Sequence, residues 1–540
     1  MRSSLAGTLP TKDDLIDVKK IKRAYYDEKP KGSVKAERVS FGTSGHRGIA
    51  TERTFNELHV AAITQAICDC RKEFGATGPC FVGHDTHLLS EEARKTVLRV
   101  LVANGVSVLV DVDFSFMPTP ALSHSILVYN ENLKAELADG ILLTPSHNPP
   151  DNGGIKYNST NGGPASVEVT ERIESLANKY LGADGEGIAM VSLEEAMTML
   201  GTYPVRERYV ADLDAIIDMK AIQGAQLKVL VDTLGGSGYH YWERIVERYQ
   251  LPFTIIHNEY DPTFSFMTRD HDGKIRMDCS SKDAMAGVIE VIGEYDLAVG
   301  NDPDYDRYGV VTKKDLLSSN HFFAIALWYL CQHRSWAIKG VGKSIVVTDL
   351  VDRIAKALDV TVYETPVGFK YFADLLFSSK VCLAGEESAG GSFLRKDGKV
   401  WSTDKDGLIM ALLAMEILAV TGKSLDVLYE QLVEEYGAVY YGRKEAAISS
   451  AGKEALKKLD PSHVEQEELA GGKVIVVRNQ SSYQNEPIGG LDVRTDKGWM
   501  VARPSGTEPL YKIYGESFVS EAHLEELLQE AQHLVDSVIS

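Results

Sequence analysis

Hydrophobic and polar positions follow two alternating periods along most of the chain. Short apolar runs, typical of buried strands, are separated by longer stretches in which apolar residues recur at helical spacing. In the first part the sequence predicts strands at residues 79–83, 106–111 and 141–143. Helices are expected at residues 56–74, before the first of these strands, and at 90–104, between the first and the second. Strands that alternate with helices in this way predict parallel β–α–β units.

The same alternation restarts twice, which predicts further units of this kind. The first restart has expected strands at 227–232 and 297–299 and a helix at 239–249. The second has expected strands at 344–348 and 360–364 and a helix at 350–358. A chain of 540 residues exceeds what one hydrophobic core usually supports, so several domains are expected.

The last hundred residues have a different pattern, which predicts a different kind of domain. Closely spaced strands are expected at 473–478, 491–495, 499–503 and 512–514, followed by a closing helix at 521–538. This order indicates an α+β unit. The region from 440 to 490 contains little that can be interpreted as a chemical site.

Composition and charge narrow the class of protein. A hydrophobic fraction of 44% and a charged fraction of 25% are typical of soluble globular proteins. The net charge of −20 argues against nucleic acid and anionic membranes as partners. An anionic substrate would need a cleft that concentrates Lys and Arg. The most apolar stretch, 408–420, is too short to span a bilayer and is expected to be a buried helix.

The cysteines and the N-terminal segment bear on the compartment. Six cysteines are scattered along the chain and none forms a CxxC pair, so neither a disulfide framework nor a zinc ribbon is indicated. The first residues contain no apolar run long enough for a signal peptide. We therefore expect a cytoplasmic protein.

Residues 144–149, Thr-Pro-Ser-His-Asn-Pro, follow the expected strand at 141–143. Proline fixes φ and cannot donate to a sheet, so Ser146 is expected on a stiff loop just beyond a strand. A hydroxyl held in this way is suited to carrying a covalent group; the alternative is an ordinary turn. A hydrolase in which His147 activates Ser146 is disfavoured, because adjacent side chains diverge on an extended segment.

Asp302, Asp304 and Asp306 alternate with other residues in Asn-Asp-Pro-Asp-Tyr-Asp-Arg. In an extended loop these three carboxylates would point the same way, which is tolerable only around a cation. Their hard oxygen ligands suit Mg²⁺ or Ca²⁺. An EF-hand requires glycine and glutamate where this chain has Arg307 and Lys313, so a catalytic Mg²⁺ site is favoured.

Several other loops offer groups for anions or sugars, although each could also be a polar turn. Phe-Gly-Thr-Ser-Gly-His-Arg-Gly at 41–48 presents Arg47, and Arg-Pro-Ser-Gly-Thr at 503–507 presents a guanidinium and two hydroxyls suited to phosphate. Thr-Pro-Val-Gly-Phe-Lys at 365–370 follows an expected strand, as does the loop with Glu386 and Ser388, whose side chains suit sugar hydroxyls.

Two tempting motifs are rejected. Gly340–Ser344 lacks the first glycine of a Walker A loop, which falls at Ala337, and it is expected to precede a strand instead of following one. His84-Asp85-Thr86-His87 could suggest a metal cluster, but a polar turn between strand and helix is the favoured interpretation.

In combination and in this order, these loops resemble the α-D-phosphohexomutase family over nearly the whole chain, most closely its bacterial phosphoglucomutases. By this resemblance Ser146 carries a phosphoryl group, and Asp302, Asp304 and Asp306 bind Mg²⁺ together with the phosphoserine oxygen. The resemblance implies a place near the phosphoserine, or a role in proton transfer, for four residues: Arg47, His147, Lys156 and Lys405. It assigns substrate binding to Arg307, Val367, Gly368, Lys370, Glu386, Ser388, Arg503, Ser505, Gly506 and Thr507.

The resemblance also implies an α/β fold of four domains around a central cleft. Three related three-layer α/β domains with mixed sheets would be followed by a smaller C-terminal α+β domain. The expected boundaries are 1–200 for the phosphoserine loop, 201–317 for the metal loop, 318–430 for the sugar loops and 431–540 for the phosphate-binding loop. A monomer or weak homodimer is expected.

The activity implied is the interconversion of α-D-glucose 1-phosphate and glucose 6-phosphate through phosphorylated Ser146 and a glucose 1,6-bisphosphate intermediate. Two departures from the family pattern are Pro303, where the metal loop commonly has glycine, and Val367 in the first sugar loop. The second sugar loop, with Glu387 in Glu-Glu-Ser, resembles that of the glucose-specific enzymes of the family. The alternatives are a mutase for mannose or glucosamine phosphates, and a metal-dependent sugar-phosphate phosphatase.

Overall fold

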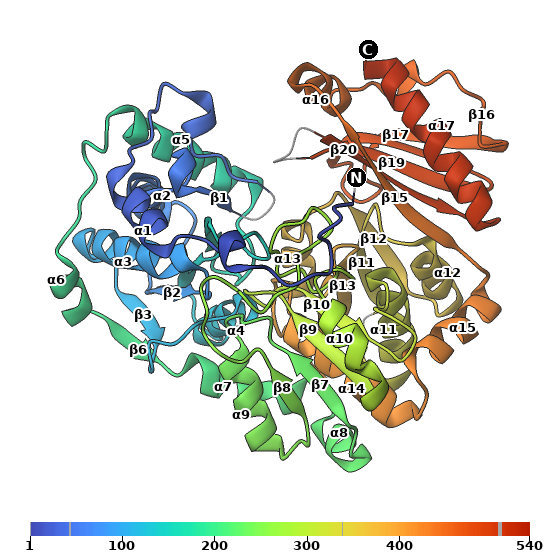
Figure 1. Ribbon diagram of the computed structural model, residues 1–540, viewed down its shortest axis with the longest axis horizontal. Helices are drawn as coiled ribbons and strands as arrows, with labels where there is room; N and C mark the ends of the chain where they lie inside the picture. Colours follow the sequence, from blue (N-terminus) through green and yellow to red (C-terminus); the bar gives the residue numbers. More distant parts are fainter. Residues whose placement is uncertain (1, 43–44, 337–338, 506–509, 540) are drawn as a thin grey trace.

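The computed structural model describes residues 2–42, 45–336, 339–505 and 510–539. Within them the strands form four sheets that follow one another along the chain. We call the segments that build these sheets the first domain (α1 to β6), the second (α7 to β10), the third (α11 to α15) and the fourth (β15 to α17). The first domain (blue) and the fourth (red) stand on opposite sides in Figure 1, and the second and third lie between and below them.

The first domain is built on a six-stranded sheet of order β1-β5-β4-β2-β3-β6. Because β6 pairs with β3, this sheet extends just beyond the expected boundary at 200. Its elements are α1 Val18–Asp27, β1 His46–Ile49, α2 Glu57–Cys70, β2 Cys80–His84, α3 Leu88–Ala103, β3 Val108–Asp111, α4 Thr119–Asn130, β4 Asp139–Leu143, β5 Asn152–Asn158, α5 Val167–Gly182, α6 Leu193–Thr198 and β6 Gly201–Tyr203.

The second and third domains each contain a four-stranded sheet, of order β10-β9-β7-β8 and β12-β11-β13-β14. The elements of the second are α7 Val205–Asp212, α8 Met219–Ala225, β7 Val229–Asp232, α9 Tyr239–Tyr249, β8 Thr254–Ile256, α10 Ala286–Val291, β9 Leu297–Asn301 and β10 Tyr308–Val311. Those of the third are α11 Ser319–His333, β11 Gly340–Ser344, α12 Asp349–Ala357, β12 Thr361–Thr365, α13 Lys370–Phe377, β13 Leu383–Glu386, β14 Gly390–Phe393, α14 Gly407–Thr421 and α15 Leu425–Tyr436.

The first three sheets share one pairing pattern, which confirms three related α/β domains with mixed sheets. In each, three parallel strands are followed along the chain by a strand that pairs antiparallel with the last of them: β5 with β4, β10 with β9, and β14 with β13. The loops of these three hairpins therefore occupy equivalent places. They carry Ser146, the Asp302–Asp306 segment, and Glu387 with Ser388.

Alternating side chains of the first sheet explain how helices cover both faces. Val82, Ile141 and Leu143 pack into a core with α2, α3 and α5. Phe81 and Leu142 point to the other face and join a core that continues through α4 into the second and third domains. The strands are thus apolar on both sides, which is expected for parallel strands covered by helices.

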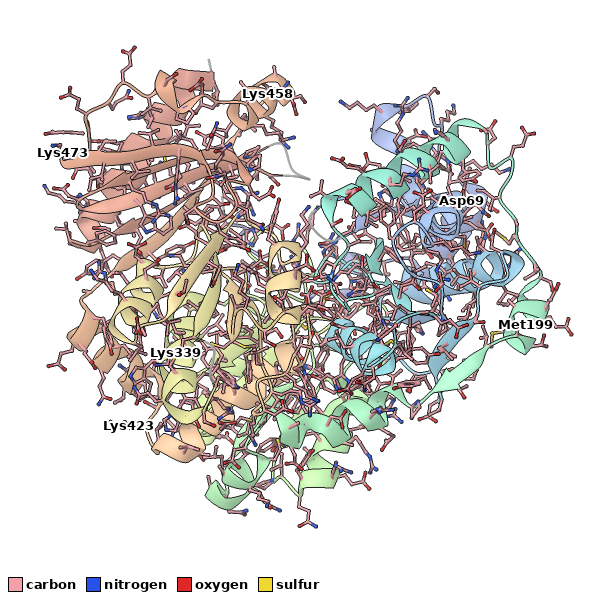
Figure 2. The ribbon with its side chains drawn as sticks, turned by 180° about the vertical axis from the view of Figure 1, so that it is seen from behind. Asp69, Met199, Lys339, Lys423, Lys458 and Lys473 are labelled. Carbon is pink, nitrogen blue, oxygen red and sulfur yellow. The ribbon has the colours of Figure 1, made fainter. Side chains whose placement is uncertain are left out.

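The fourth domain is the smaller α+β unit that the sequence predicted. Its antiparallel sheet has the order β15-β20-β19-β18-β17-β16, with α16 and α17 packed against it. Its elements are β15 Tyr440–Ala447, α16 Ser450–Lys457, β16 Glu468–Leu469, β17 Gly472–Gln480, β18 Pro487–Thr495, β19 Gly498–Pro504, β20 Leu510–Ser517 and α17 Glu521–Ile539. Figure 2 shows Met199 and Lys473 on the outer margins of the first and fourth domains.

One expected strand is wrong. The strand β11 is the glycine-containing segment Gly340–Ser344 itself, and residues 345–348 are not part of it. A Cβ on Gly342 would lie 2.9 Å from the Phe372 ring of α13, so the glycine lets this helix approach the sheet closely. The Walker A interpretation remains excluded, because these glycines lie within a strand instead of forming a phosphate loop after one.

The apolar stretch at 408–420 is the helix α14, whose first eleven residues are buried. In the described parts of the chain no single helix is long and apolar enough to cross a membrane. The pair α14 and α15 passes that test only together, and it is bent by 79°.

Candidate active site

Ser146 lies in the hairpin loop between β4 and β5 and is 1% exposed. Its φ is +60°, a left-handed conformation that is uncommon for a residue with a side chain. In this conformation its Oγ donates a hydrogen bond to Asp302 Oδ2 at 2.9 Å. The loop can fold back because Gly154 has no Cβ, which would lie 2.1 Å from the Thr144 carbonyl oxygen.

The three aspartates converge, as the sequence predicted. Carboxylate oxygens of Asp302, Asp304 and Asp306 lie within 4.8 Å of one another, and all three residues are fully buried. Asp304 Oδ1 and Asp306 Oδ1 have no hydrogen-bond partner within the described residues. Buried carboxylate oxygens without partners fit a hard divalent cation, so the donor set matches Mg²⁺.

The geometric reasoning behind two expectations is wrong, because neither loop is extended. Tyr305 has φ +60° and its N–H donates to the Asp302 carbonyl, so the aspartates converge through a tight turn. The left-handed conformation of Ser146 likewise brings His147 Nδ1 to 3.3 Å from Ser146 Oγ. Adjacent side chains diverge on a strand, but these two residues are not on one.

Two lysines reach the aspartates from different domains. Lys156 on β5 places Nζ 2.5 Å from Asp304 Oδ2 and 3.0 Å from Asp306 Oδ2. Lys405 places Nζ 3.0 Å from Asp306 Oδ2. A Cβ on Gly390 would lie 2.2 Å from the Lys405 side chain, so the absence of a side chain at this position of β14 leaves room for the lysine.

The charges of the site oppose one another strongly. Burial, together with the neighbouring Asp304 and Asp306, raises the pKa of Asp302 well above its ordinary value. Burial alone would also raise the pKa of Asp306, but Lys156 and Lys405 lower it well below its usual range. Lys156 and Lys405 thus bring two positive charges to the triad in a protein with a net charge of −20.

A cavity of about 260 Å³ is lined by Lys156 and Lys405 and gathers half of the expected site residues. It is lined, among others, by Arg47, Lys156, Arg307, Val367, Gly368, Lys370, Glu386, Ser388 and Lys405. A second hollow of about 890 Å³ adjoins it, sharing Arg307, Ser388 and Lys512, and is lined by His147. All four domains contribute to this cleft.

The two expected sugar loops are bound to each other. Gly368, in the loop between β12 and α13, donates its N–H to Glu386 Oε1 at 2.8 Å. The φ of Gly368 is +134°, a conformation that favours glycine. The carboxylate of Glu386 therefore fixes the first loop while its residue lines the cavity.

The expected phosphate loop is only partly described. Arg503 lies at the end of β19 and its Nε donates to the Ile488 carbonyl at 2.9 Å. Ser505 donates its N–H to the Leu510 carbonyl, and its own carbonyl accepts from Lys453. Neither Arg503 nor Ser505 lines the two hollows described above. Gly506 and Thr507 lie outside the described residues.

Three residues that sequence reasoning missed also contact the site. Thr119 at the start of α4 donates from Oγ1 to Asp304 Oδ2 at 2.8 Å. Asp278 lies 4.0 Å from His147 Nε2 and 3.5 Å from Arg307 Nη1. Asp404 accepts from Asn158, and burial raises the pKa of Asp404 to about 6. Asp404 adjoins Lys405 in sequence, whereas no pattern indicated Thr119 or Asp278.

Comparison with known proteins is consistent along the entire chain. Four domain families match in order, the phosphoglucomutase/phosphomannomutase alpha/beta/alpha domains I, II and III and the C-terminal domain, at residues 38–182, 207–315, 318–436 and 452–534.

A phosphoglucomutase from Komagataeibacter xylinus is 44% identical, with 100% of this chain and 98% of that protein covered. Human phosphoglucomutase-1 is 26% identical, covering 96% and 95% of the two chains. The structure of pp63/parafusin, a phosphoglucomutase from Paramecium, has the same fold, with a TM-score of 0.75, 20% identity, and coverage of 94% of this chain and 95% of that one. The chain therefore belongs to the phosphoglucomutase/phosphomannomutase family of isomerases, which confirms the resemblance drawn from its loops.

Proposed function

We propose that this chain interconverts α-D-glucose 1-phosphate and glucose 6-phosphate, with Ser146 as the phosphoryl carrier. The observation that carries the proposal is the 2.9 Å contact between Ser146 Oγ and Asp302 within a buried acidic triad. A cavity lined by cationic and sugar-compatible side chains includes Lys156 and Lys405, which contact the triad. The full-length similarity to a bacterial phosphoglucomutase supports glucose phosphates as substrates.

The reaction consists of two phosphoryl transfers. The 6-hydroxyl of glucose 1-phosphate attacks the phosphorus on Ser146, and the bond between phosphorus and Oγ breaks. The resulting glucose 1,6-bisphosphate turns over in the cleft. Ser146 Oγ then takes the 1-phosphoryl group, and glucose 6-phosphate leaves.

Asp302, Asp304, Asp306 and an oxygen of phosphorylated Ser146 would hold Mg²⁺, which when bound supplies positive charge to the transferring phosphoryl group. His147, 3.3 Å from Ser146 Oγ, is our candidate for the proton at that oxygen. Lys405, which lines the sugar cavity, is our candidate for the proton of the substrate hydroxyl. Arg47 and Lys156 add positive charge beside the phosphoserine.

Recognition must serve both orientations of the intermediate. We assign the 3- and 4-hydroxyls of the sugar to Glu386 and Ser388, since these hydroxyls remain accessible in both orientations. Val367, Gly368 and Lys370 close the same side of the cavity. The phosphate distal to Ser146 is assigned to Arg503, Ser505, Gly506 and Thr507, with Arg307 on the metal side.

All six cysteines are free thiols, which supports a cytoplasmic location.

Mass spectrometry of the purified protein tests the proposal, with a phosphate on Ser146 as the expected result. Ser146→Ala should abolish conversion of glucose 1-phosphate, whereas Ser192→Ala, at the exposed start of α6, should not. Full activity of Ser146→Ala would refute the proposal. A phosphatase would release inorganic phosphate steadily, and higher turnover on mannose or glucosamine phosphates would favour the other mutases.

A further inference from the structure

The His84-Asp85-Thr86-His87 turn lies beside the Ser146 loop. It follows β2, which pairs in parallel with β4, and the N–H of Asp85 donates to the Leu143 carbonyl at 3.0 Å. Asp85 and His87 are buried, with no exposed side-chain surface. The mechanism above gives these two ionisable groups no role, although they lie next to the strand end that leads to Ser146.

The Asp85 carboxylate accepts four hydrogen bonds. Oδ1 accepts from the His87 N–H at 2.9 Å and from Ser90 Oγ at 2.6 Å. Oδ2 accepts from His87 Nδ1 at 2.8 Å and from Thr144 Oγ1 at 2.6 Å. A carboxylate with four donors is held as a fixed anion.

Thr144 transmits this fixed position to the residue that carries the reaction. Because its hydroxyl proton points at Asp85, the oxygen of Thr144 is free to accept, and it accepts the Ser146 N–H at 2.8 Å. This bond fixes the chain immediately before Ser146. A left-handed conformation costs on the order of 1 kcal/mol or more, so it persists only where the surroundings determine it.

His87 fixes the chain on the other side of Ser146. Its Nε2 lies 2.9 Å from the Asn148 carbonyl oxygen, and its Nδ1 faces the Asp85 carboxylate. Both partners can only accept, so hydrogen bonds to both require a proton on each ring nitrogen. The Phe264 ring of the second domain lies 5.1 Å from the His87 ring.

We propose that the buried Asp85–His87 ion pair is a positioning device that holds Ser146 Oγ against Asp302. The pair grips the loop on both flanks, through Thr144 before Ser146 and through Asn148 after it. Asp85 and His87 touch neither substrate nor metal and act through the backbone of the loop. The inference rests on the proposed role of Ser146.

Kinetics of matched variants test the positioning role. Thr144→Val removes the hydroxyl that links Asp85 to Ser146 and preserves side-chain shape, so kcat should fall roughly 10- to 100-fold. KM for glucose 1-phosphate should stay within about two-fold, because the cavity lining is unchanged. The control is Thr96→Val, which removes another buried hydroxyl of the first domain, bonded to Tyr25 at 3.0 Å. It should lower stability comparably while leaving kcat within about two-fold.

Substitution of His87 provides the rescue experiment. His87→Gln removes the charge and cannot donate to both partners, so kcat should fall roughly 100-fold. His87→Arg keeps a positive charge and separate N–H donors, so it should recover at least about ten-fold of that loss. If kcat of the Thr144 and His87→Gln variants equals that of the wild type, or if Thr96→Val loses as much, the proposal is wrong.

Two readouts do not depend on mutase activity. Nitrogen-15 NMR of the wild-type protein should show protons on both nitrogens of His87 at about pH 7. A neutral single-proton ring would overturn the ion pair. Hydrogen exchange at the Ser146 amide should be faster in Thr144→Val than in Thr96→Val. If the wild-type protein lacks mutase activity, the proposed function fails, while these two measurements still decide the positioning role.

Discussion

Lys156 Nζ lies 2.5 Å from Asp304 Oδ2, so an ammonium group rests directly on the acidic triad. Lys156 is 5% exposed, and Asp304 and Asp306 are fully buried. The lysine therefore supplies counter-charge at the carboxylates that we assign to Mg²⁺. Lysine and metal ion compete electrostatically for the same oxygens.

Replacing this lysine should change metal affinity and stability in opposite directions. In Lys156→Met the metal-free protein should lose about 3–5 kcal/mol of stability, because buried carboxylates lose their partner. Affinity for Mg²⁺, measured by calorimetry on metal-stripped protein, should rise at least about ten-fold, since a like charge is removed. Lys370→Met is the control, because the charged neighbours of Lys370 are Glu171 and Glu486. Unchanged affinity in Lys156→Met would exclude the competition.

Asp304→Ala should remove metal-dependent turnover and leave the fold intact. Asp304 accepts from Thr119 and Lys156 through Oδ2, while its buried Oδ1 has no partner among the described residues and is available to a metal. We expect kcat to fall by roughly three orders of magnitude at any Mg²⁺ concentration. Asp315→Ala, which breaks an exposed pair with Lys282, should respond to Mg²⁺ as the wild type does. The same metal dependence in both variants would separate the triad from catalysis.

Glu364 lies on β12 and joins the third domain to the fourth. Its carboxylate accepts from Arg478 at 2.6 Å and from Arg494 at 2.9 Å, both in the fourth domain. In Glu364→Gln these guanidinium groups keep Asp492 but lose the anion that ties them to the third domain, so hydrogen exchange should quicken along β17 and β18. KM for glucose 1-phosphate should rise several-fold, because the distal phosphate loop belongs to the same domain. Glu454→Gln, on the exposed face of α16, should change neither quantity.

Glu92 should contribute to stability in a pH-dependent way. Burial would raise the pKa of Glu92, but donors from Lys22, Tyr26 and Lys95 lower it to about 2. Since the pKa is lower in the folded state than the ordinary 4.5, the stabilisation is present above about pH 4.5 and is lost as pH falls towards 2. Glu92→Gln should cost on the order of 2 kcal/mol at about pH 7.

The measurement is chemical denaturation of both proteins at a series of pH values. The difference between Glu92→Gln and the wild type should shrink between about pH 4.5 and 2 and vanish below it. A difference that stays constant over this range would show that the carboxylate charge is not the stabilising group.

Much of the fold was predictable from local pattern. The helix at 239–249 and the closing helix were placed nearly at their observed ends, because their apolar spacing is regular. The strand expected at 344–348 failed because Gly340 and Gly342 resemble a loop in sequence. That segment is a strand through its pairing with β12 and β13, and Gly342 leaves room for Phe372 against it. Thr119 and Asp278 could not be found, since their functional neighbours are far away in the sequence.

The sequence by itself determined the residue types of each loop and their order along the chain, because each hydroxyl, carboxylate and glycine can be identified in a short stretch of sequence. Only the tertiary structure decided that the loops of Ser146, Asp302 and Glu387 occupy equivalent hairpins of three related sheets. The left-handed conformation of Ser146 also depends on tertiary contacts, since Thr144 and Asp85 come from neighbouring strands. Orientation toward Asp302 is set by hydrogen bonds between distant segments, and no local pattern encodes them.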